Sequence, residues 1–208
     1  MKTIISIFIL SSLQLMAQRD YKEQARAMGI ENIEKFKSFL ALPNDAAQKE
    51  QISANIDWAT QELIALDFKI KTLNTSHLPL LLANKNVNKN LPTVAFYLHL
   101  DGQAVDLSKW NQEDPYSAEL KQKTKEGFEL IGWENINNID NDDLRIFARS
   151  SADDKGPFAM FLIALEYLKN NNKSPAFNIK LIIDFEEEQS SPGLPQAVQK
   201  YKEELLAD

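Results

Sequence analysis

Apolar residues recur at the spacing of an α-helix in several stretches of the chain. Before Pro43-Asn44 they return every three or four positions, and this dipeptide ends the run. A second such run follows directly. Later in the chain, Gly156-Pro157 opens an amphipathic segment, with the proline in the first turn, where its missing N–H is tolerated. The pattern predicts helices over residues 20–42, 45–66, 158–169 and 192–206.

Shorter segments between these helices are typical of β-strands. Residues 93–100 and 177–185 are nearly continuous apolar runs, as in strands that are buried on both faces. Residues 101–143 contain no long periodic segment and predict a long irregular loop, which is usually functional in a compact domain. The predicted strands cover residues 67–73, 77–83, 93–100, 144–148 and 177–185.

This alternation of strands and helices predicts the α/β class, as a three-layer αβα arrangement around a mostly parallel sheet. The chain has 208 residues, of which 44% are hydrophobic, so one domain with a full core is expected. In sheets of this kind, ligands bind outside the carboxyl ends of the strands.

The N-terminus has the features of an export signal. Lys2 precedes an apolar stretch over residues 4–15, and the small residue Ala17 follows. We therefore expect a signal peptide over residues 1–17, a mature chain of 18–208 and a periplasmic or secreted protein. The apolar stretch is shorter than the roughly 20 residues that a membrane-spanning helix needs. Without cysteine, the chain has neither disulfides nor a lipid-carrying residue, and no stable membrane anchor is expected.

Charge excludes one class of partner. The net charge is −7, and loss of Lys2 with the signal leaves 22 basic against 30 acidic residues, a net charge of −8. The lysines are scattered among acids and form no basic stripe, so we expect no nucleic-acid binding.

Three candidate motifs each follow an apolar segment. In His99-Leu100-Asp101, residues i and i+2 share a face, so Asp101 is placed to orient the imidazole of a metal-bound His99; the alternative is a buried histidine satisfied by a carboxylate. Asp153 and Asp154 are adjacent carboxylates that favour a nearby cation, although Asp154 also suits a helix N-cap.

The third motif is Glu186-Glu187-Glu188. One carboxylate of this run is a candidate metal ligand and its neighbour a general base, whereas a solvated charge run is the alternative. His77, the other of the two histidines, is interpreted as structural. Ser190-Ser191 lacks the Gly-x-Ser-x-Gly pattern of a serine nucleophile, and no phosphate-binding glycine loop is present.

Together the motifs resemble those of the co-catalytic zinc peptidases that include carnosinase-type dipeptidases, acetylornithine deacetylase and aminoacylase. The matching segments are HLDGQAVDLSKWNQEDPY, RSSADDKGP and FEEEQSSPGL. The resemblance implies a phosphorylase/hydrolase-like zinc exopeptidase catalytic domain that hydrolyses dipeptides or short peptides. The proline after Lys155-Gly156 favours the dipeptidase branch, and deacylation of N-acyl amino acids is the alternative activity.

Carried over by position, the resemblance implies two divalent metal ions, Zn with Mn or Co as alternatives. His99, Asp153 and Glu188 would be metal ligands, Asp101 would orient His99, and Glu187 would be the general base. The resemblance also implies a cis peptide between Asp153 and Asp154. Ala104, Ser150 and Ser190 depart from the family pattern by small residues or loop changes.

Parts of the family pattern have no counterpart before Asp208. These are a further acidic ligand, a late metal-binding histidine and an inserted lid domain that commonly mediates dimerisation. We therefore expect the chain to be a truncated catalytic domain without a lid, and a homodimer remains open for a longer enzyme. The isolated chain is expected to lack turnover, and the alternative function is that of an inactive fragment with weak metal binding.

Overall fold

The computed structural model describes residues 21–137 and 143–208. The predicted signal peptide lies outside the described residues. Residues 21–31 are helical and lead into α2 (Ile33–Leu40), so the predicted first helix is confirmed with an interruption at Asn32. Within the described residues, no helix is both long enough and apolar enough to cross a membrane.

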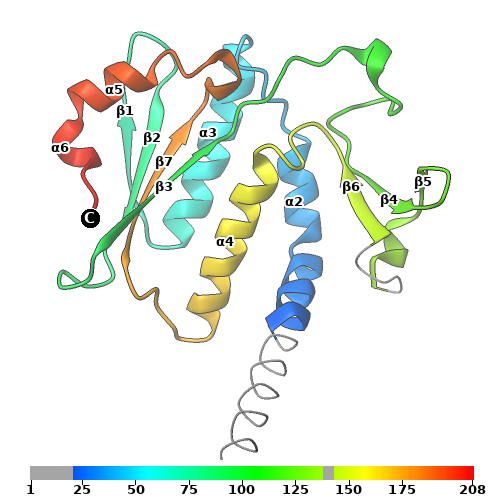
Figure 1. Ribbon diagram of the computed structural model, residues 1–208, viewed down its shortest axis with the longest axis horizontal. Coiled ribbons are helices and arrows are strands. Elements are labelled where there is room, and N and C mark those ends of the chain that lie inside the picture. Colours follow the sequence, from blue (N-terminus) through cyan, green and yellow to red (C-terminus); the bar gives the residue numbers. More distant parts are fainter. Residues whose placement is uncertain (1–20, 138–142) are drawn as a thin grey trace, which may run out of the picture.

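A four-stranded sheet is the centre of the fold (Figure 1). Its strands lie in the order β1 (Lys69–Leu73), β2 (Leu80–Lys85), β7 (Asn178–Asp184) and β3 (Thr93–His99). Helices α3 (Lys49–Ala65) and α4 (Lys155–Asn170) cover one face, and α5 (Leu194–Lys200) and α6 (Lys202–Leu205) cover the other. The three-layer α/β prediction is confirmed.

The prediction of a mostly parallel sheet is wrong. Only β3 and β7 run parallel, whereas β1 with β2 and β2 with β7 are antiparallel. The connection of residues 74–79 is too short for the crossover that parallel neighbours need, so β1 and β2 form antiparallel neighbours. β3 is also less buried than predicted, because it is the last strand in the order of this sheet and Tyr97 is 43% exposed.

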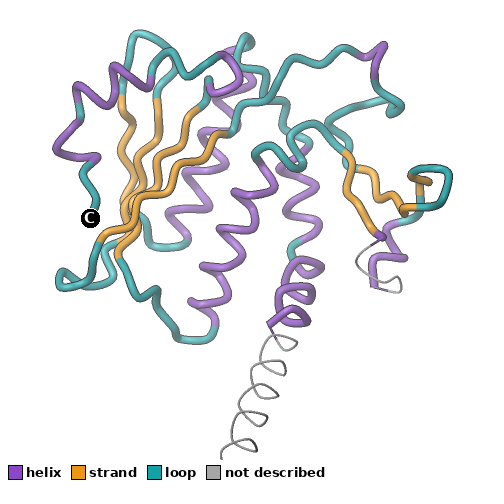
Figure 2. Tube along the Cα trace, in the orientation of Figure 1, coloured by secondary structure: helices purple, strands orange, loops and turns teal. Residues whose placement is uncertain are grey.

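The long loop predicted over residues 101–143 contains two strands instead. β4 (Glu119–Lys123) pairs with β5 (Phe128–Leu130) and with β6 (Leu144–Phe147) in a separate antiparallel sheet (Figure 2). The predicted strand over residues 144–148 is β6 of this sheet. Because β4 and β5 are short and rich in charged residues, they lack the apolar alternation that reveals a strand.

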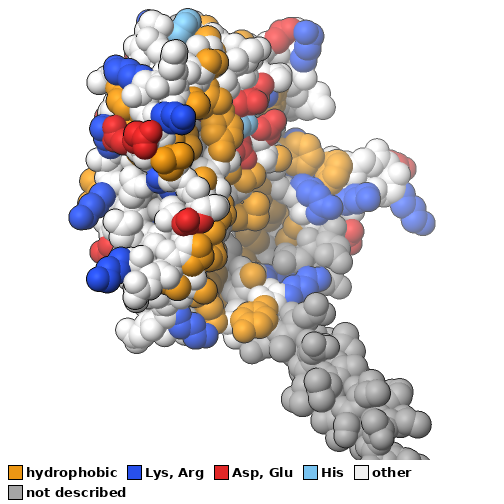
Figure 3. Space-filling model, turned by 60° about the vertical axis from the view of Figure 1, so that its left-hand side comes forward, with side chains coloured by type: hydrophobic (Ala, Val, Ile, Leu, Met, Phe, Trp, Pro, Cys, Tyr) orange, Lys and Arg blue, Asp and Glu red, His pale blue; other side chains and the backbone are white. Residues whose placement is uncertain are grey.

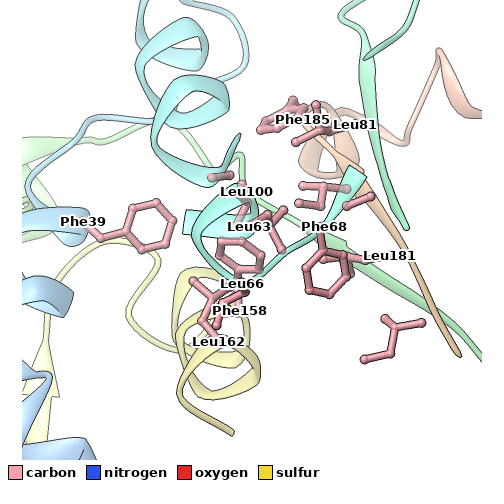
Figure 4. Close-up of a cluster of buried hydrophobic side chains, with 14 of the residues drawn as sticks. Phe39, Leu63, Leu66, Phe68, Leu81, Leu100, Phe158, Leu162, Leu181 and Phe185 are labelled. Carbon is pink, nitrogen blue, oxygen red and sulfur yellow. The ribbon is translucent and has the colours of Figure 1, made fainter. Parts of the chain in front are cut away.

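The main core lies between the sheet and helices α3 and α4. Phe39, Phe158 and Phe185 are fully buried in it together with Leu100, which lies between His99 and Asp101 (Figure 4). The single helix predicted over residues 192–206 is divided at Tyr201 into α5 and α6, which cover a smaller apolar cluster on the opposite face. Burial of Leu100 anchors the histidine motif to the core.

Candidate functional site

The carboxyl ends of β3 and β7 bring two of the motifs together. His99, the last residue of β3, is in parallel register with Asp184, the last residue of β7. The N–H of Leu100 donates to the Asp184 carbonyl at 2.9 Å, which continues the pairing by one residue. Glu187 and Glu188 follow β7 in a short 3₁₀ turn. The predicted placement at one sheet edge is therefore confirmed for His99 and the glutamates, whereas Asp153 follows β6 of the separate sheet and precedes α4. Figure 3 shows acidic side chains beside a histidine on this face.

Asp101 links the histidine to the glutamate turn. Its Oδ1 lies 3.3 Å from His99 Nδ1. The two carboxylate oxygens accept the N–H groups of Glu187 at 3.1 Å and Glu188 at 3.0 Å. Asp101 is fully buried, so these donors replace the water that would otherwise solvate its charge. This arrangement directs Nδ1 toward Asp101 and Nε2 toward the site.

His99 Nε2 faces two further carboxylates. Asp153 Oδ1 lies 2.8 Å from it, and Glu187 Oε2 lies 3.8 Å from it. Burial of the ring favours its neutral form, but hydrogen bonds and charges from Asp101, Asp153 and Asp154 outweigh this and raise the pKa of His99 to about 9. Without a metal, the imidazole is thus protonated at neutral pH.

The two adjacent aspartates have different environments. Their peptide bond is cis, as the resemblance implied. Asp154 stands at the N-cap position of α4 but makes no side-chain capping bond. Instead its Oδ2 accepts the backbone N–H of His99 at 3.2 Å, and burial raises the pKa of its carboxyl. Asp153 is 75% exposed at the site, so it is the aspartate available to a ligand.

The three consecutive glutamates also differ, so the simple solvated-run alternative does not describe them. Glu186 is buried, and its Oε2 accepts the N–H of Leu78 at 2.8 Å. Glu187 is 43% exposed and faces His99. Glu188 accepts a hydrogen bond from Gln103 Nε2 at 3.0 Å.

A buried lysine and a glycine hold the aspartate turn in place. Lys155 is fully buried, and its Nζ donates to the carbonyls of Phe39 at 2.8 Å and Leu42 at 2.6 Å. Burial lowers the pKa of Lys155 to about 7. At Gly156, a Cβ would lie 2.2 Å from the Ser151 carbonyl oxygen, so only glycine allows α4 to approach this turn so closely.

A second set of contacts joins the histidine motif to the segment before α4. Asn44 Nδ2 donates to the Leu100 carbonyl at 2.8 Å and to Ser150 Oγ at 3.0 Å. The N–H of Gly102 donates to the Asn44 carbonyl at 2.8 Å. Ser150, which departs from the family pattern, has a φ of 61° and is buried, so it takes a conformation that favours glycine.

The structure therefore joins four of the five predicted site residues directly, namely His99, Asp101, Asp153 and Glu187. Glu188 is connected to them through its backbone, while its side chain contacts Gln103. Within residues 21–137 and 143–208, no group of three or more His, Asp or Glu side chains has the arrangement of a formed metal site. His77 is exposed on the connection between β1 and β2, and it is not among the residues that contact His99.

Asp184 and Tyr97 also contact the site, although neither belongs to the three sequence motifs. Asp184 is buried, and it accepts hydrogen bonds from the Tyr97 hydroxyl at 2.8 Å and from the Glu186 N–H at 2.9 Å. Burial and the Asp184 charge raise the pKa of Tyr97, so its hydroxyl remains a donor. One signal was present in the sequence, because an aspartate inside the apolar segment LIIDF needs partners that only a polar neighbour supplies.

An α/β fold that brings a histidine, an aspartate and a glutamate together has residue types that metal-dependent hydrolases use. Comparison with known proteins agrees: residues 95–208 match the model of peptidase family M20/M25/M40. The match covers more than half of the chain, and the protein belongs to this family of metal-dependent peptidases.

The chain is similar to individual relatives over part of their length. It is 26% identical to the Beta-Ala-His dipeptidase of Mus musculus over 129 residues, which are 62% of this chain and 22% of that protein. It superposes on the crystal structure of human carnosine dipeptidase 1 with a TM-score of 0.68 at 22% identity, covering 86% of this chain and 37% of that one.

A third relative is the M20 family metallo-carboxypeptidase Sso-CP2 from Sulfolobus solfataricus. The TM-score is 0.66 at 28% identity, over 86% of this chain and 36% of that one. The chain thus spans little more than a fifth of the curated relative and over a third of each solved structure.

Proposed function

We propose that the chain carries part of a dinuclear metal site that hydrolyses the amide bond of dipeptides or other short peptides. The observation that carries this proposal is the His99 imidazole, held by buried Asp101 on one side and facing Asp153 and Glu187 on the other. Metal-bound histidines usually have such a carboxylate behind the ring, because it selects the tautomer and increases the basicity of the ligating nitrogen.

The donor set fits a divalent ion in part. His99 Nε2 and Asp153 Oδ1 are nitrogen and oxygen donors of the kinds that Zn²⁺, Mn²⁺ or Co²⁺ accept, and they already converge. Glu188, after exchanging its Gln103 partner, would be a ligand of the second ion. We propose zinc as the native metal, with two ions in the complete enzyme.

The metals would supply the Lewis acidity that activates water and polarises the amide carbonyl. In this proposal Glu187 accepts the proton of the attacking water and transfers it to the leaving amine. Its carboxylate is only partly exposed and lies beside His99, while its backbone N–H is held by Asp101. Asp101 keeps both His99 and the turn that carries Glu187 in place.

The isolated chain is proposed to bind metal weakly and to have no turnover. Two donors converge here, whereas a catalytic zinc normally has three protein ligands. We further propose export after cleavage behind Ala17, which N-terminal sequencing of the mature protein tests: a mature chain that still begins at Met1 would contradict it.

Metal binding by the purified, metal-free chain tests the site. Titration with Co²⁺, followed by its visible absorption, and with Zn²⁺, followed by calorimetry, should show weak binding. His99→Gln and Asp153→Asn should abolish it, and the exposed His77→Gln is the matched control that should not. Glu188→Gln should weaken binding, whereas Glu187→Gln should leave it unchanged, because Glu187 is proposed as a base and not as a ligand.

Turnover is measured on the same preparation with a dipeptide such as β-Ala-His and with an N-acetyl amino acid. No hydrolysis is expected from the chain alone. Hydrolysis that a chelator abolishes would contradict the proposed inactivity, and a preference for the N-acetyl substrate would favour the deacylase alternative. Metal binding that survives His99→Gln would contradict the proposed site itself.

A further inference from the structure

A phenol–carboxylate pair lies where β3 and β7 end, next to the glutamate turn. The Tyr97 hydroxyl donates to Asp184 Oδ2 at 2.8 Å, and it also lies 3.2 Å from Ser191 Oγ. The other oxygen of Asp184, Oδ1, accepts the N–H of Glu186 at 2.9 Å. Asp184 and Tyr97 therefore contact the first and the last residue of the segment 186–191, which we call the glutamate turn.

The glutamate turn needs contacts from outside itself. Internally it is closed by bonds from the N–H groups of Gln189 and Ser191 to the Glu186 carbonyl, at 3.1 Å and 2.9 Å. Ser190 and Ser191 have φ values of 69° and 49°, a left-handed conformation that is unfavourable for residues other than glycine. Such a conformation persists only where the surroundings determine it.

Two buried carboxylates take the N–H groups of three consecutive residues of the turn. Asp184 accepts that of Glu186, and Asp101 accepts those of Glu187 and Glu188. The backbone of the turn is thus held from the β7 side and from the β3 side, while the side chains of Glu187 and Glu188 remain partly exposed. Hydrogen bonds to a charged acceptor are the strong ones, so this arrangement limits where the two side chains lie.

We propose that Tyr97 and Asp184 are positioning residues that hold the glutamate turn in the conformation that presents Glu187 to the site. The inference rests on the proposed function, in which Glu187 is the general base. Pairing of the strands does not need the phenol, because β3 and β7 are already in register from Thr93 and Asn178 to His99 and Asp184. The role of Tyr97 is directed at the turn, through Asp184 and Ser191.

Amide hydrogen exchange in the metal-free chain, measured by NMR, tests this inference. Tyr97→Phe leaves one oxygen of buried Asp184 without its donor and removes the contact with Ser191. We expect exchange at residues 186–191 to become about 10-fold faster, from the usual contribution of a hydrogen bond to a charged group. Exchange in the middle of β7, at Leu181 and Ile182, should stay within about 2-fold of the parent chain.

Tyr167→Phe is the matched control. The Tyr167 hydroxyl donates to Gln24 at 2.6 Å, and Tyr167 lies on α4 near Lys169 and Asn170, at the end opposite the site. Tyr167→Phe should leave amide exchange in the glutamate turn unchanged. Ser191→Ala is a second, milder variant that removes only the outer contact of Tyr97, and it should accelerate exchange at Ser190 and Ser191 more than at β7.

Unchanged exchange in the turn of Tyr97→Phe would overturn the inference. Uniform acceleration of exchange along β7 and the glutamate turn would also overturn the inference, because this result would show that Tyr97 contributes only to general stability. If Tyr97→Phe does not fold, exchange in Ser191→Ala is judged by the same criteria. These outcomes are independent of metal binding and hydrolysis. Failure of the proposed function would instead appear as absence of His99-dependent Co²⁺ binding in the parent chain.

Discussion

Replacement of Asp101 by asparagine tests the centre of the site in the metal-free protein. Asp101 accepts from His99 Nδ1 and from the N–H groups of Glu187 and Glu188, and it is fully buried. An amide of the same shape has one oxygen, and its NH₂ group would face a donor. One charge-assisted bond is lost and the others become weaker, so Asp101→Asn should lower the free energy of unfolding by about 2–4 kcal/mol.

The loss of unfolding free energy in Asp101→Asn should depend on pH, because Asp101 is the carboxylate that raises the pKa of His99 most. Burial opposes protonation of the ring, but the carboxylates raise the pKa from 6.5 to about 9. A pKa that is higher in the folded state contributes stability that is fully present below pH 6.5 and is lost as the pH rises to about 9. The whole pKa shift corresponds to about 3 kcal/mol at most. The difference in unfolding free energy between the parent chain and Asp101→Asn should therefore narrow as the pH rises from 6.5 to about 9.

Urea denaturation of both proteins at pH 6, 7.5 and 9 measures the gap. NMR titration of the ring C–H of His99, in chains that also carry His77→Gln, measures the pKa directly; it should fall by at least about one unit in Asp101→Asn. Asp106→Asn is the control, because Asp106 lies in the following loop and accepts only local hydrogen bonds. A gap that stays constant from pH 6 to 9, or an unchanged pKa of His99, would refute the reasoning.

Three further predictions concern the support of the site. Gly156→Ala should lower the free energy of unfolding by about 1–3 kcal/mol, since its Cβ would meet a backbone oxygen. The control Gly29→Ala has open space around the new Cβ and should stabilise the helix by about 0.5–1 kcal/mol. Equal urea midpoints for the two variants would contradict this prediction. Phe158→Ala, in the main core, should cost about 3–5 kcal/mol in urea denaturation, and a loss below about 1 kcal/mol would refute its placement. Because the pKa of Lys155 is lowered by burial to about 7, the folded chain binds fewer protons than the unfolded one between pH 7 and 10.5. The contribution of Lys155 to the free energy of unfolding should therefore rise with pH in this window, opposite in sign to that of His99. An equal pH dependence in Lys155→Met would show that Lys155 does not cause it.

Much of the architecture follows from local signals in the chain. The helical spacing before Pro43 and after Gly156-Pro157 predicts α2 and α4, and the apolar runs predict β3 and β7 nearly to their ends. Periodicity reports which side of a helix is buried, whereas the apolar run of β7 reports burial along nearly the whole strand. β4 and β5 were missed for the opposite reason, because their residues are mostly exposed or only partly buried.

The direction of β2 relative to β7 was beyond the reach of such signals, whereas the short connection between β1 and β2 already requires an antiparallel pair. The residue pattern of a single strand does not show whether its neighbours run parallel or antiparallel to it. The mixed sheet therefore follows only from the strand order, in which β2 lies between β1 and β7. The break between α5 and α6 likewise depends on packing against the sheet, where Tyr201 contacts the smaller apolar cluster.

For the site, the sequence determined which residue types stand at the ends of β3 and β7 and before α4, and the family motifs assigned them expected roles. Only the tertiary structure decided which carboxylate of each group faces His99. Asp153 is turned to the imidazole and Asp154 to the backbone, while Glu186 is buried, Glu187 faces His99 and Glu188 contacts Gln103. Adjacent residues are equivalent in composition, and they become distinct because the fold offers each carboxylate different donors and a different degree of burial.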